Sequence, residues 1–400
     1  AVQPDGKILM AGSAGTGNPD YSLVALVRLL PDGSLDATFG IDGKVFTNAG
    51  LLFSLAFVTD LLIQSDGKIV VIGSASTLNS PFNTFLIRFH PDGAIDNTFG
   101  TNGKRILHDC DGAINNARLQ PDDKVVITGV STSASSQLDI VVHRLLPNGQ
   151  PDSSFGTGGV VVTNLGTTND AGYAPAILPD GKILIAGHKN EELYSNATDF
   201  VLVRYLPDGS LDDAFGEGGV AVHSFSSVQD DALDLLVMPD DKILLTGYFQ
   251  GDAGNYDFTL VRCLPNGALD TAFGNGGILL LDLGSQFDLS RYCIRQPDGK
   301  ILLAGTTDIA TWEPRPAIVR LNADFTLDST FGSNGVLKAG VDDLINDVYS
   351  LTHYALQPDG NLVFCAESVT DPEGNFVFCA FRVLTGLNLS ALHFSKNSVN

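Results

Sequence analysis

The chain has 400 residues, with 46 acidic against 23 basic side chains and a formal net charge of -23 at pH 7. So large a negative charge repels phosphate groups, so nucleic acid and anionic membrane surfaces are not expected as partners. No apolar run reaches the roughly 18 residues that a membrane-spanning helix needs, so membrane insertion is not expected either.

Two short motifs recur along the chain. The first, QPDGK, begins at Gln3 and returns in variant form at Gln64, Gln120, Leu178, Met238, Gln296 and Gln357. The second is an arginine followed by a Pro-Asp-Gly-x-Leu-Asp-x-x-Phe-Gly pattern. Its arginines lie 56 to 62 residues apart, at Arg28, Arg88, Arg144, Arg204, Arg262, Arg320 and Arg382. A period of this length predicts a repeat architecture, which overrides the two or three domains that the length alone suggests.

The period divides the chain into seven units, and each unit contains four strand-like runs. The units are residues 1–50, 51–107, 108–165, 166–224, 225–283, 284–340 and 341–400. In the fifth unit the runs are residues 233–238, 242–248, 258–264 and 278–283, separated by Gly, Pro, Asn and Asp. Such runs are typical of strands, and no segment has a helical stripe. Four antiparallel strands per unit predict an all-β, seven-bladed β-propeller that forms a single domain over residues 1–400.

The units resemble the delta-60 repeat of bacterial secreted and surface proteins. The consensus of that repeat has the form QPDGKI…VRL…DGSLDxTFGxxGxV, and residues 32–40 and 208–216 match it closely. The resemblance covers essentially the whole chain. It implies a propeller-like fold and a secreted or surface location, with little established chemistry. The first unit lacks most of its opening strand, and the seventh lacks the Asp-x-x-Phe-Gly pattern after Arg382.

The repeated residues are expected to build the scaffold. Six of the arginines are followed eight residues later by an aspartate, as Arg28 is by Asp36, which predicts a salt bridge within each unit. The alternative is a ring of arginines that binds an anion. The repeated phenylalanines, such as Phe39, are expected to pack between neighbouring blades. The Pro-Asp-Gly segments lack the ligand spacing of an EF-hand loop and are interpreted as turns.

Ligand binding is expected where the copies differ. The loops between the second and third strands vary in length and content, and loops on a rigid scaffold often carry binding sites. The candidate ligand-binding residues are Tyr21, Phe82, Tyr194, Tyr256, Trp312 and Glu313. Aromatic rings beside carboxylates suit stacking on a sugar ring while its hydroxyls are hydrogen-bonded. The alternative is that these aromatic residues pack against their own loops.

A second group of candidate residues lies in the connections between blades. Aspartates recur a similar distance before the Gln motif, and the candidate metal ligands are Asp111, Asp170, Asp230, Asp231, Asp288 and Asp347. Clustered carboxylates repel each other unless they are solvated, protonated or bridged by a cation. Ca²⁺ is therefore a possible ligand, and a solvated acidic rim is the alternative.

The function favoured by these patterns is a non-catalytic binding or adhesion module that is secreted or displayed on the cell surface. Its expected partner is a glycan or a protein. A purely structural module of a larger surface protein is the alternative, and a hydrolase or lyase comes third, because the histidines occupy different positions in different units. His188 and the neighbouring Glu191 and Glu192 are the candidates for acid–base chemistry. Cys365 and Cys379 are expected to face each other across a hairpin, as a disulfide or as two buried thiols.

Overall fold

The computed structural model shows a chain of β-strands joined by short turns. Within the described part of the chain every regular element is a strand. No helix there has the length and apolar character needed to cross a bilayer. The described residues are 1–15, 21–50, 54–77, 80–107, 114–132, 137–166, 169–190, 197–226, 228–250, 254–307, 315–338, 348–368, 377–383 and 393–397.

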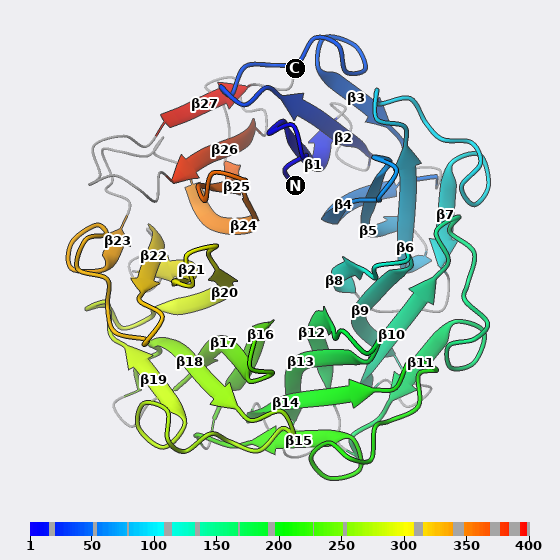
Figure 1. The fold of residues 1–400 in the computed structure, drawn as a ribbon. Coiled ribbons are helices and arrows are strands. Elements are labelled where there is room, and N and C mark those ends of the chain that lie inside the picture. Colours follow the sequence, from blue (N-terminus) through cyan, green and yellow to red (C-terminus); the bar gives the residue numbers. More distant parts are fainter. Residues whose placement is uncertain are drawn as a thin grey trace. The chain divides into compact units, whose positions relative to one another are not determined.

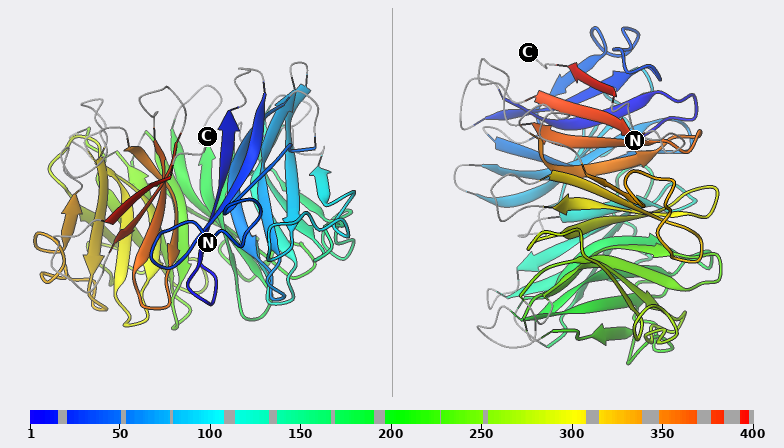
Figure 2. Two further views of the ribbon diagram at one scale, coloured as in Figure 1. Left: turned by 90° about the horizontal axis from the view of Figure 1, so that it is seen from above. Right: turned by 90° about the vertical axis from the view of Figure 1, so that its left-hand side faces the viewer.

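The chain forms two compact units. Unit 1 contains Ala1–Lys182 and Leu206–Ser210, and unit 2 contains Ile183–Tyr205 and Leu211–Ser398. The strands of both units belong to antiparallel sheets in which neighbours in sequence are neighbours in the sheet (Figure 1 and Figure 2). Repeated four-stranded sheets confirm the predicted all-β class.

Unit 1 holds a three-stranded sheet followed by two four-stranded sheets. The missing strand of the first sheet agrees with the incomplete first repeat. In chain order the strands are β1 (Ile8–Gly15), β2 (Ser22–Leu29) and β3 (Lys44–Thr47); β4 (Ser54–Ile63), β5 (Ile69–Thr77), β6 (Ser80–Phe89) and β7 (Lys104–Leu107); β8 (Ile114–Leu119), β9 (Val125–Thr132), β10 (Leu138–Leu145) and β11 (Val160–Thr163); then β12 (Ala171–Ile177).

Unit 2 continues the same pattern, and its last sheet forms although the seventh repeat lacks the Phe-Gly motif. In chain order the strands are β13 (Ile183–Asn190), β14 (Thr198–Tyr205) and β15 (Val220–His223); β16 (Asp230–Val237), β17 (Ile243–Phe249), β18 (Phe258–Cys263) and β19 (Ile278–Leu281); β20 (Leu289–Arg295), β21 (Ile301–Thr307), β22 (Arg315–Leu321) and β23 (Val336–Lys338); β24 (Val348–Leu356), β25 (Leu362–Ser368), β26 (Val377–Val383) and β27 (His393–Asn397).

The first strand of several sheets carries a bulge opposite a glycine. In the β16–β17 pair the register shifts between Ala232 and Asp234, and Gly247 lies opposite Ala232. A Cβ atom at Gly247 would lie 1.9 Å from the carbonyl oxygen of Asp231, so only glycine fits there. The bulge helps to fix the position of the neighbouring Asp231.

Each of the first six repeats contains a cluster of arginine, aspartate and phenylalanine, which we call the Arg–Asp–Phe cluster. In the third copy Arg144 Nε lies 2.8 Å from Asp152 Oδ2, and the Arg144 guanidinium lies 4.6 Å from the centre of the Phe155 ring. Equivalent ion pairs join Arg28 to Asp36, Arg88 to Asp96, Arg204 to Asp212, Arg262 to Asp270 and Arg320 to Asp328. The predicted salt bridge is therefore present in all six copies.

The same arginine also connects its sheet to the next repeat. Arg144 donates a hydrogen bond of 2.6 Å to the carbonyl oxygen of Pro207, and Arg204 donates one of 2.8 Å to that of Pro265. The phenylalanine packs against the glycine of the same turn, since a Cβ atom at Gly267 would lie 2.7 Å from the Phe215 ring. The clusters of Arg28, Arg88, Arg144 and Arg204 thus fix one repeat against its successor within a unit.

The register of the last sheet corrects one prediction. Cys365 pairs with Ala380, and Cys379 pairs with Ala366. Because side chains alternate between the two faces of a sheet, this offset of one residue places the cysteine positions on opposite faces. The expected facing pair is wrong, and the register does not favour a disulfide between them.

We predict that Arg144→Lys destabilises the protein although the charge is kept. Lysine cannot reproduce the planar fork that contacts Asp152, Ser154 and Pro207 together. The free energy of unfolding, measured by urea denaturation, should fall by about 2 kcal/mol. Arg291→Lys on an exposed part of β20 is the control and should change it by less than about 0.5 kcal/mol. Equal effects of both substitutions would contradict the structural role of the cluster.

We also predict acid-induced loss of stability from these clusters. Burial alone would raise the pKa of Asp152, but hydrogen bonds from Ser154 and the charges of Arg144 and Lys124 lower it from 3.8 to about 2. The pKa of Asp96 is lowered to about 2 by Thr98 and Arg88 in the same way, against the effect of burial. The folded state binds protons at these two carboxylates less tightly than the unfolded state does. The contribution of Asp152 and Asp96 to the free energy of unfolding is therefore complete above pH 4 and is lost toward pH 2.

Urea denaturation repeated between pH 5 and pH 2 measures this loss. Asp152→Asn should lower stability near neutral pH and flatten the dependence on pH, because the titrating group is gone. A wild-type stability that stays constant over this range would refute the linkage.

Candidate functional site

The chemically distinctive residues of unit 2 lie at one end of its strands, which we call the variable-loop end. There β13, β17 and β19 end, and β14, β16, β18 and β20 begin. The variable loops leave the sheets at this end, as expected. Two groups of side chains lie at this end: one centred on Asp231, the other formed by Asp257, Asp282 and Asp288.

Asp231 is a buried carboxylate that accepts hydrogen bonds from three strands. Its Oδ1 lies 3.0 Å from His188 Nδ1 of β13 and accepts a 2.8 Å bond from the Thr198 hydroxyl of β14. Its Oδ2 accepts a 2.6 Å bond from the Tyr248 hydroxyl of β17. Asp231 and Tyr248 are direct cross-strand partners, so the bulge beside them sets this contact. We call these four residues the Asp231 cluster.

The hydrogen bonds decide the charge of this carboxylate. Burial acts to raise the pKa of Asp231, but the contacts from His188, Tyr248 and Thr198 outweigh burial and lower it. The group is therefore ionised at neutral pH and acts as a hydrogen-bond acceptor. The contact between Asp231 Oδ1 and His188 Nδ1 also fixes the orientation of the imidazole ring.

Tyr256 connects the Asp231 cluster to the neighbouring aromatic residues. Its ring makes an edge contact with Tyr248 at 5.5 Å and stacks on Phe287 at 5.3 Å between ring centres. Burial and the negative charges of Asp231 and Asp230 raise the pKa of its hydroxyl, so the phenol stays protonated. Tyr256, one of the predicted ligand-binding residues, is therefore packed against a ring of β17 and a ring of the connection before β20, and it is partly exposed.

The predicted metal ligands Asp170, Asp230 and Asp288 are fully buried rather than solvated. Each accepts a backbone hydrogen bond from the residue five positions earlier, namely Leu165, Phe225 and Leu283. This repeated contact closes the connection between successive repeats. Their spacing in the sequence is therefore accounted for by loop closure, and Ca²⁺ binding stays a prediction.

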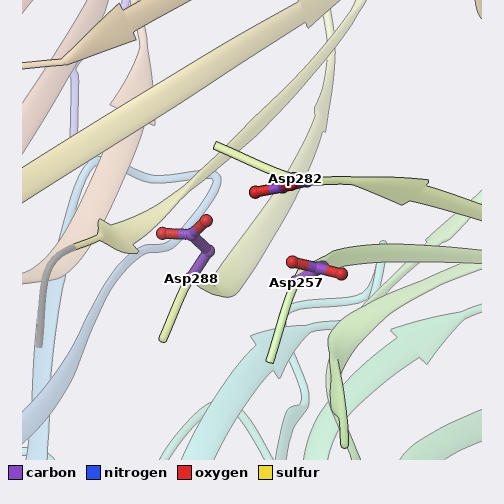
Figure 3. Close-up of side chains that lie close together, drawn as sticks. All are labelled: Asp257, Asp282 and Asp288. Carbon is purple, nitrogen blue, oxygen red and sulfur yellow. The ribbon is translucent and has the colours of Figure 1, made fainter. Parts of the chain in front are cut away.

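Among the described residues, one group of carboxylates is close enough to share a cation. One oxygen each from Asp257, Asp282 and Asp288 lies within 4.8 Å of the others, and Figure 3 shows the three side chains facing one another. Asp257 precedes β18, Asp282 follows β19 and Asp288 precedes β20. Burial, followed by the charges of Asp282 and Asp288, raises the pKa of Asp257. Only Asp288 of this group was predicted as a metal ligand.

An equivalent site in unit 1 shows how this crowding arises. There Asn164 occupies the position of Asp282 and donates a 2.8 Å hydrogen bond to Asp139, which corresponds to Asp257. In unit 2 the donor is replaced by a third carboxylate, and Asp257 Oδ1 is buried without a hydrogen-bond partner. The recurrence of an aspartate five residues before Arg144, Arg204 and Arg262 is the sequence signal that could have identified Asp257.

A cysteine–histidine contact in unit 2 does not have the properties of a nucleophilic pair. Cys263 Sγ lies 3.5 Å from His223 Nε2, which also lies 3.0 Å from the Gly267 carbonyl oxygen. Burial raises the pKa of the Cys263 thiol to about 12 and lowers the pKa of His223. The reactive thiolate is therefore scarce at neutral pH.

Several predicted residues cannot be placed at this site. Tyr21 precedes β2 in unit 1 and is half-buried. The side chain of Phe82 and the whole of Tyr194, Trp312, Glu313, Asp111 and Asp347 lie outside the described residues, as do Glu191 and Glu192. Tyr248, Thr198, Asp257 and Asp282 were not predicted as site residues.

The repeated antiparallel sheets and their Arg–Asp–Phe clusters define an all-β repeat protein of the propeller class. The chain belongs to the family described as "Domain of unknown function (DUF5122) beta-propeller". That family matches residues 3–39, 64–99, 120–155, 178–215, 239–273 and 296–331. Comparison with curated proteins found no match.

Solved structures are similar to this chain at low sequence identity. A puromycin hydrolase is 13% identical with a TM-score of 0.50, and the match covers 95% of this chain and 50% of the hydrolase. The chain thus spans half the length of that enzyme. A protein of unknown function from Dyadobacter fermentans is 11% identical with a TM-score of 0.47, covering 82% of this chain and 94% of that protein. A glucose dehydrogenase is 11% identical with a TM-score of 0.46, covering 82% and 99% of the two chains.

We predict that Asp282→Asn stabilises the protein in the absence of divalent cations. The new amide would repeat the contact of Asn164 with Asp139 and remove one of three crowded charges. The free energy of unfolding at pH 7 should rise by about 1 kcal/mol. The pKa of Asp257 is raised in the folded wild type, so its ionisation at neutral pH costs stability there. At low pH Asp257 is protonated, this cost disappears, and the difference between the two proteins should vanish.

Calcium addition tests the same carboxylates as a metal site. A cation bound only to the folded state would add about 2.7 kcal/mol at 100 times its dissociation constant. Millimolar CaCl₂ should then raise the melting temperature of the wild type more than NaCl of equal ionic strength, and should not do so for Asp282→Asn. Equal shifts from both salts would indicate charge screening alone.

Proposed function

We propose that this chain is a non-catalytic binding module, secreted or displayed on a bacterial cell surface, that binds a glycan at the variable-loop end of unit 2. The observation that carries the proposal is the Asp231 cluster beside Tyr256. An ionised, buried acceptor, an imidazole and two tyrosine rings converge there on strands that the Arg–Asp–Phe clusters hold in place. We further propose that the fold is a seven-bladed β-propeller built from delta-60 repeats.

The chemistry of these groups suits a sugar. Carbohydrates present apolar ring faces together with hydroxyl groups, and half-exposed tyrosines can contact both. Tyr248 and His188 are held by Asp231 in fixed orientations, which reduces the entropy lost when a ligand binds. The Asp231 carboxylate itself is occupied by three protein donors, so its role is to position the residues around it.

The carboxylate and thiol properties favour binding over catalysis. Asp231 has a lowered pKa, which suits an acceptor rather than a general acid. The Cys263 thiol has a raised pKa, which disfavours nucleophilic attack. The activities in the names of the similar structures belong to those proteins, and at such low identity no reaction is transferred to this chain.

A glycan array followed by calorimetry on a bound glycan tests the proposal. Tyr256→Leu should weaken binding about tenfold, because it removes the ring face, whereas Tyr256→Phe should retain most of the affinity. Trp312→Ala tests the predicted aromatic residue outside the described region in the same assay. Thermal melting of each variant confirms that the fold is retained.

The outcomes separate the two leading functions. Loss of binding in Tyr256→Leu but not in Tyr256→Phe supports a ring-stacking site at the variable-loop end. Absence of glycan binding by the wild-type protein would favour the purely structural module. Equal affinity of the wild type and Tyr256→Leu would remove the site from this end of unit 2.

A further inference from the structure

A cavity of about 670 Å³ lies between two neighbouring sheets of unit 2. One wall comes from the end of β19, with Asp282 and Leu283. The other comes from β23 and the turn before it, with Ser333, Val336 and Lys338. The volume is in the range of small-molecule sites, and the lining combines apolar side chains with a few polar groups.

The polar groups of this cavity have donor and acceptor capacity for a ligand. Asp282 Oδ1 accepts a 2.6 Å hydrogen bond from the Gly284 backbone, and within the described residues no ion pair joins Asp282 to a cationic side chain. Lys338 Nζ donates to the carbonyl oxygen of Leu283 and so bridges the two walls. Ser333 is exposed at the rim. Of the residues that line the cavity, Asp282 is therefore the one that can bind a ligand cation.

The surroundings of Asp282 determine which ligand charge is favoured there. Asp257 and Asp288 lie behind it, with an oxygen of each within 4.8 Å of an Asp282 oxygen. Asp257 Oδ1 is buried without a hydrogen-bond donor. A cationic group at this end of the cavity would offset the charges of Asp282 and Asp257, whereas Asp288 already accepts hydrogen bonds from the Leu283 backbone and the Ser285 hydroxyl. The net charge of -23 would also concentrate a polycationic ligand near the surface.

We propose that this cavity binds a glycan carrying free amino groups, with a sugar ammonium group at Asp282 and the ring face against Leu283 and Val336. In this arrangement Ser333 and Lys338 donate hydrogen bonds to ring or hydroxyl oxygens. The inference rests on the proposed glycan-binding function and names the class of glycan: one built from glucosamine rather than from neutral or acidic sugars.

A matched pair of oligosaccharides tests this proposal with the intact chain. Glucosamine oligosaccharide and its fully N-acetylated counterpart of equal length differ only at the amino nitrogens, which are ammonium groups in the first and neutral acetamido groups in the second. The wild-type protein should bind the amine form at least about tenfold more tightly in calorimetry at low salt. Asp282→Asn should abolish the preference. Asp42→Asn is the charge-matched control at an exposed left-handed position that asparagine tolerates, and should keep it.

A second variant keeps every charge. Ser333→Trp at the exposed rim should fill the cavity and weaken binding of the amine form by a similar factor, with an unchanged melting temperature. Equal binding of both oligosaccharides, or equal losses in Asp282→Asn and Asp42→Asn, would overturn the proposal. Glycan binding that depends on Tyr256 but not on Asp282 would leave the proposed function standing and reject this cavity alone.

Discussion

The buried guanidinium group is the constraint on which the rest of the structure depends. A charged arginine in a sheet interior is unfavourable unless its donors and its charge are satisfied. Here an aspartate of the same repeat, a carbonyl group of the next repeat and a phenylalanine ring satisfy it together, as in Arg144 with Asp152, Pro207 and Phe155. The spacing of the motif is therefore set both by the turn within one sheet and by the packing of the next sheet against it. This explains why lysine does not replace the arginine in any repeat.

The fold was largely predictable because its signals are local and repeated. The Pro-Asp-Gly turns, the short apolar runs and the eight-residue spacing of Arg28 and Asp36 each depend on a few neighbouring residues. The predicted fifth-unit strands begin and end within a few residues of β16 to β19. The main difference is the start of β16 at Asp230, because polar residues at that position were interpreted as a loop. Asp231 can be buried there because His188, Thr198 and Tyr248 contact its carboxylate.

The candidate site was only partly predictable because its contacts join distant parts of the chain. Tyr256 and Asp231 could be singled out by residue type, but the hydrogen bond from Tyr248 depends on the register around a bulge. Asp257 and Asp282 meet because two strand ends are adjacent in the sheet. Asn164 is hydrogen-bonded to Asp139, whereas Asp282 at the equivalent position forms a cluster of three carboxylates with Asp257 and Asp288. Such differences between copies are the strongest pointers to function in a repeated scaffold.

The hydrogen bonds that Arg28, Arg88, Arg144 and Arg204 donate to the following repeat have a consequence for how such chains lengthen or shorten. Because Arg144 needs the turn at Pro207, a repeat that loses its successor exposes a buried cation with unsatisfied donors. A change in repeat number is therefore tolerated only when a whole period is gained or lost, so that every guanidinium again meets a turn. Duplication in evolution would be confined to complete periods. Cleavage inside a repeat would instead destabilise the preceding repeat, so the folding stabilities of neighbouring repeats are coupled.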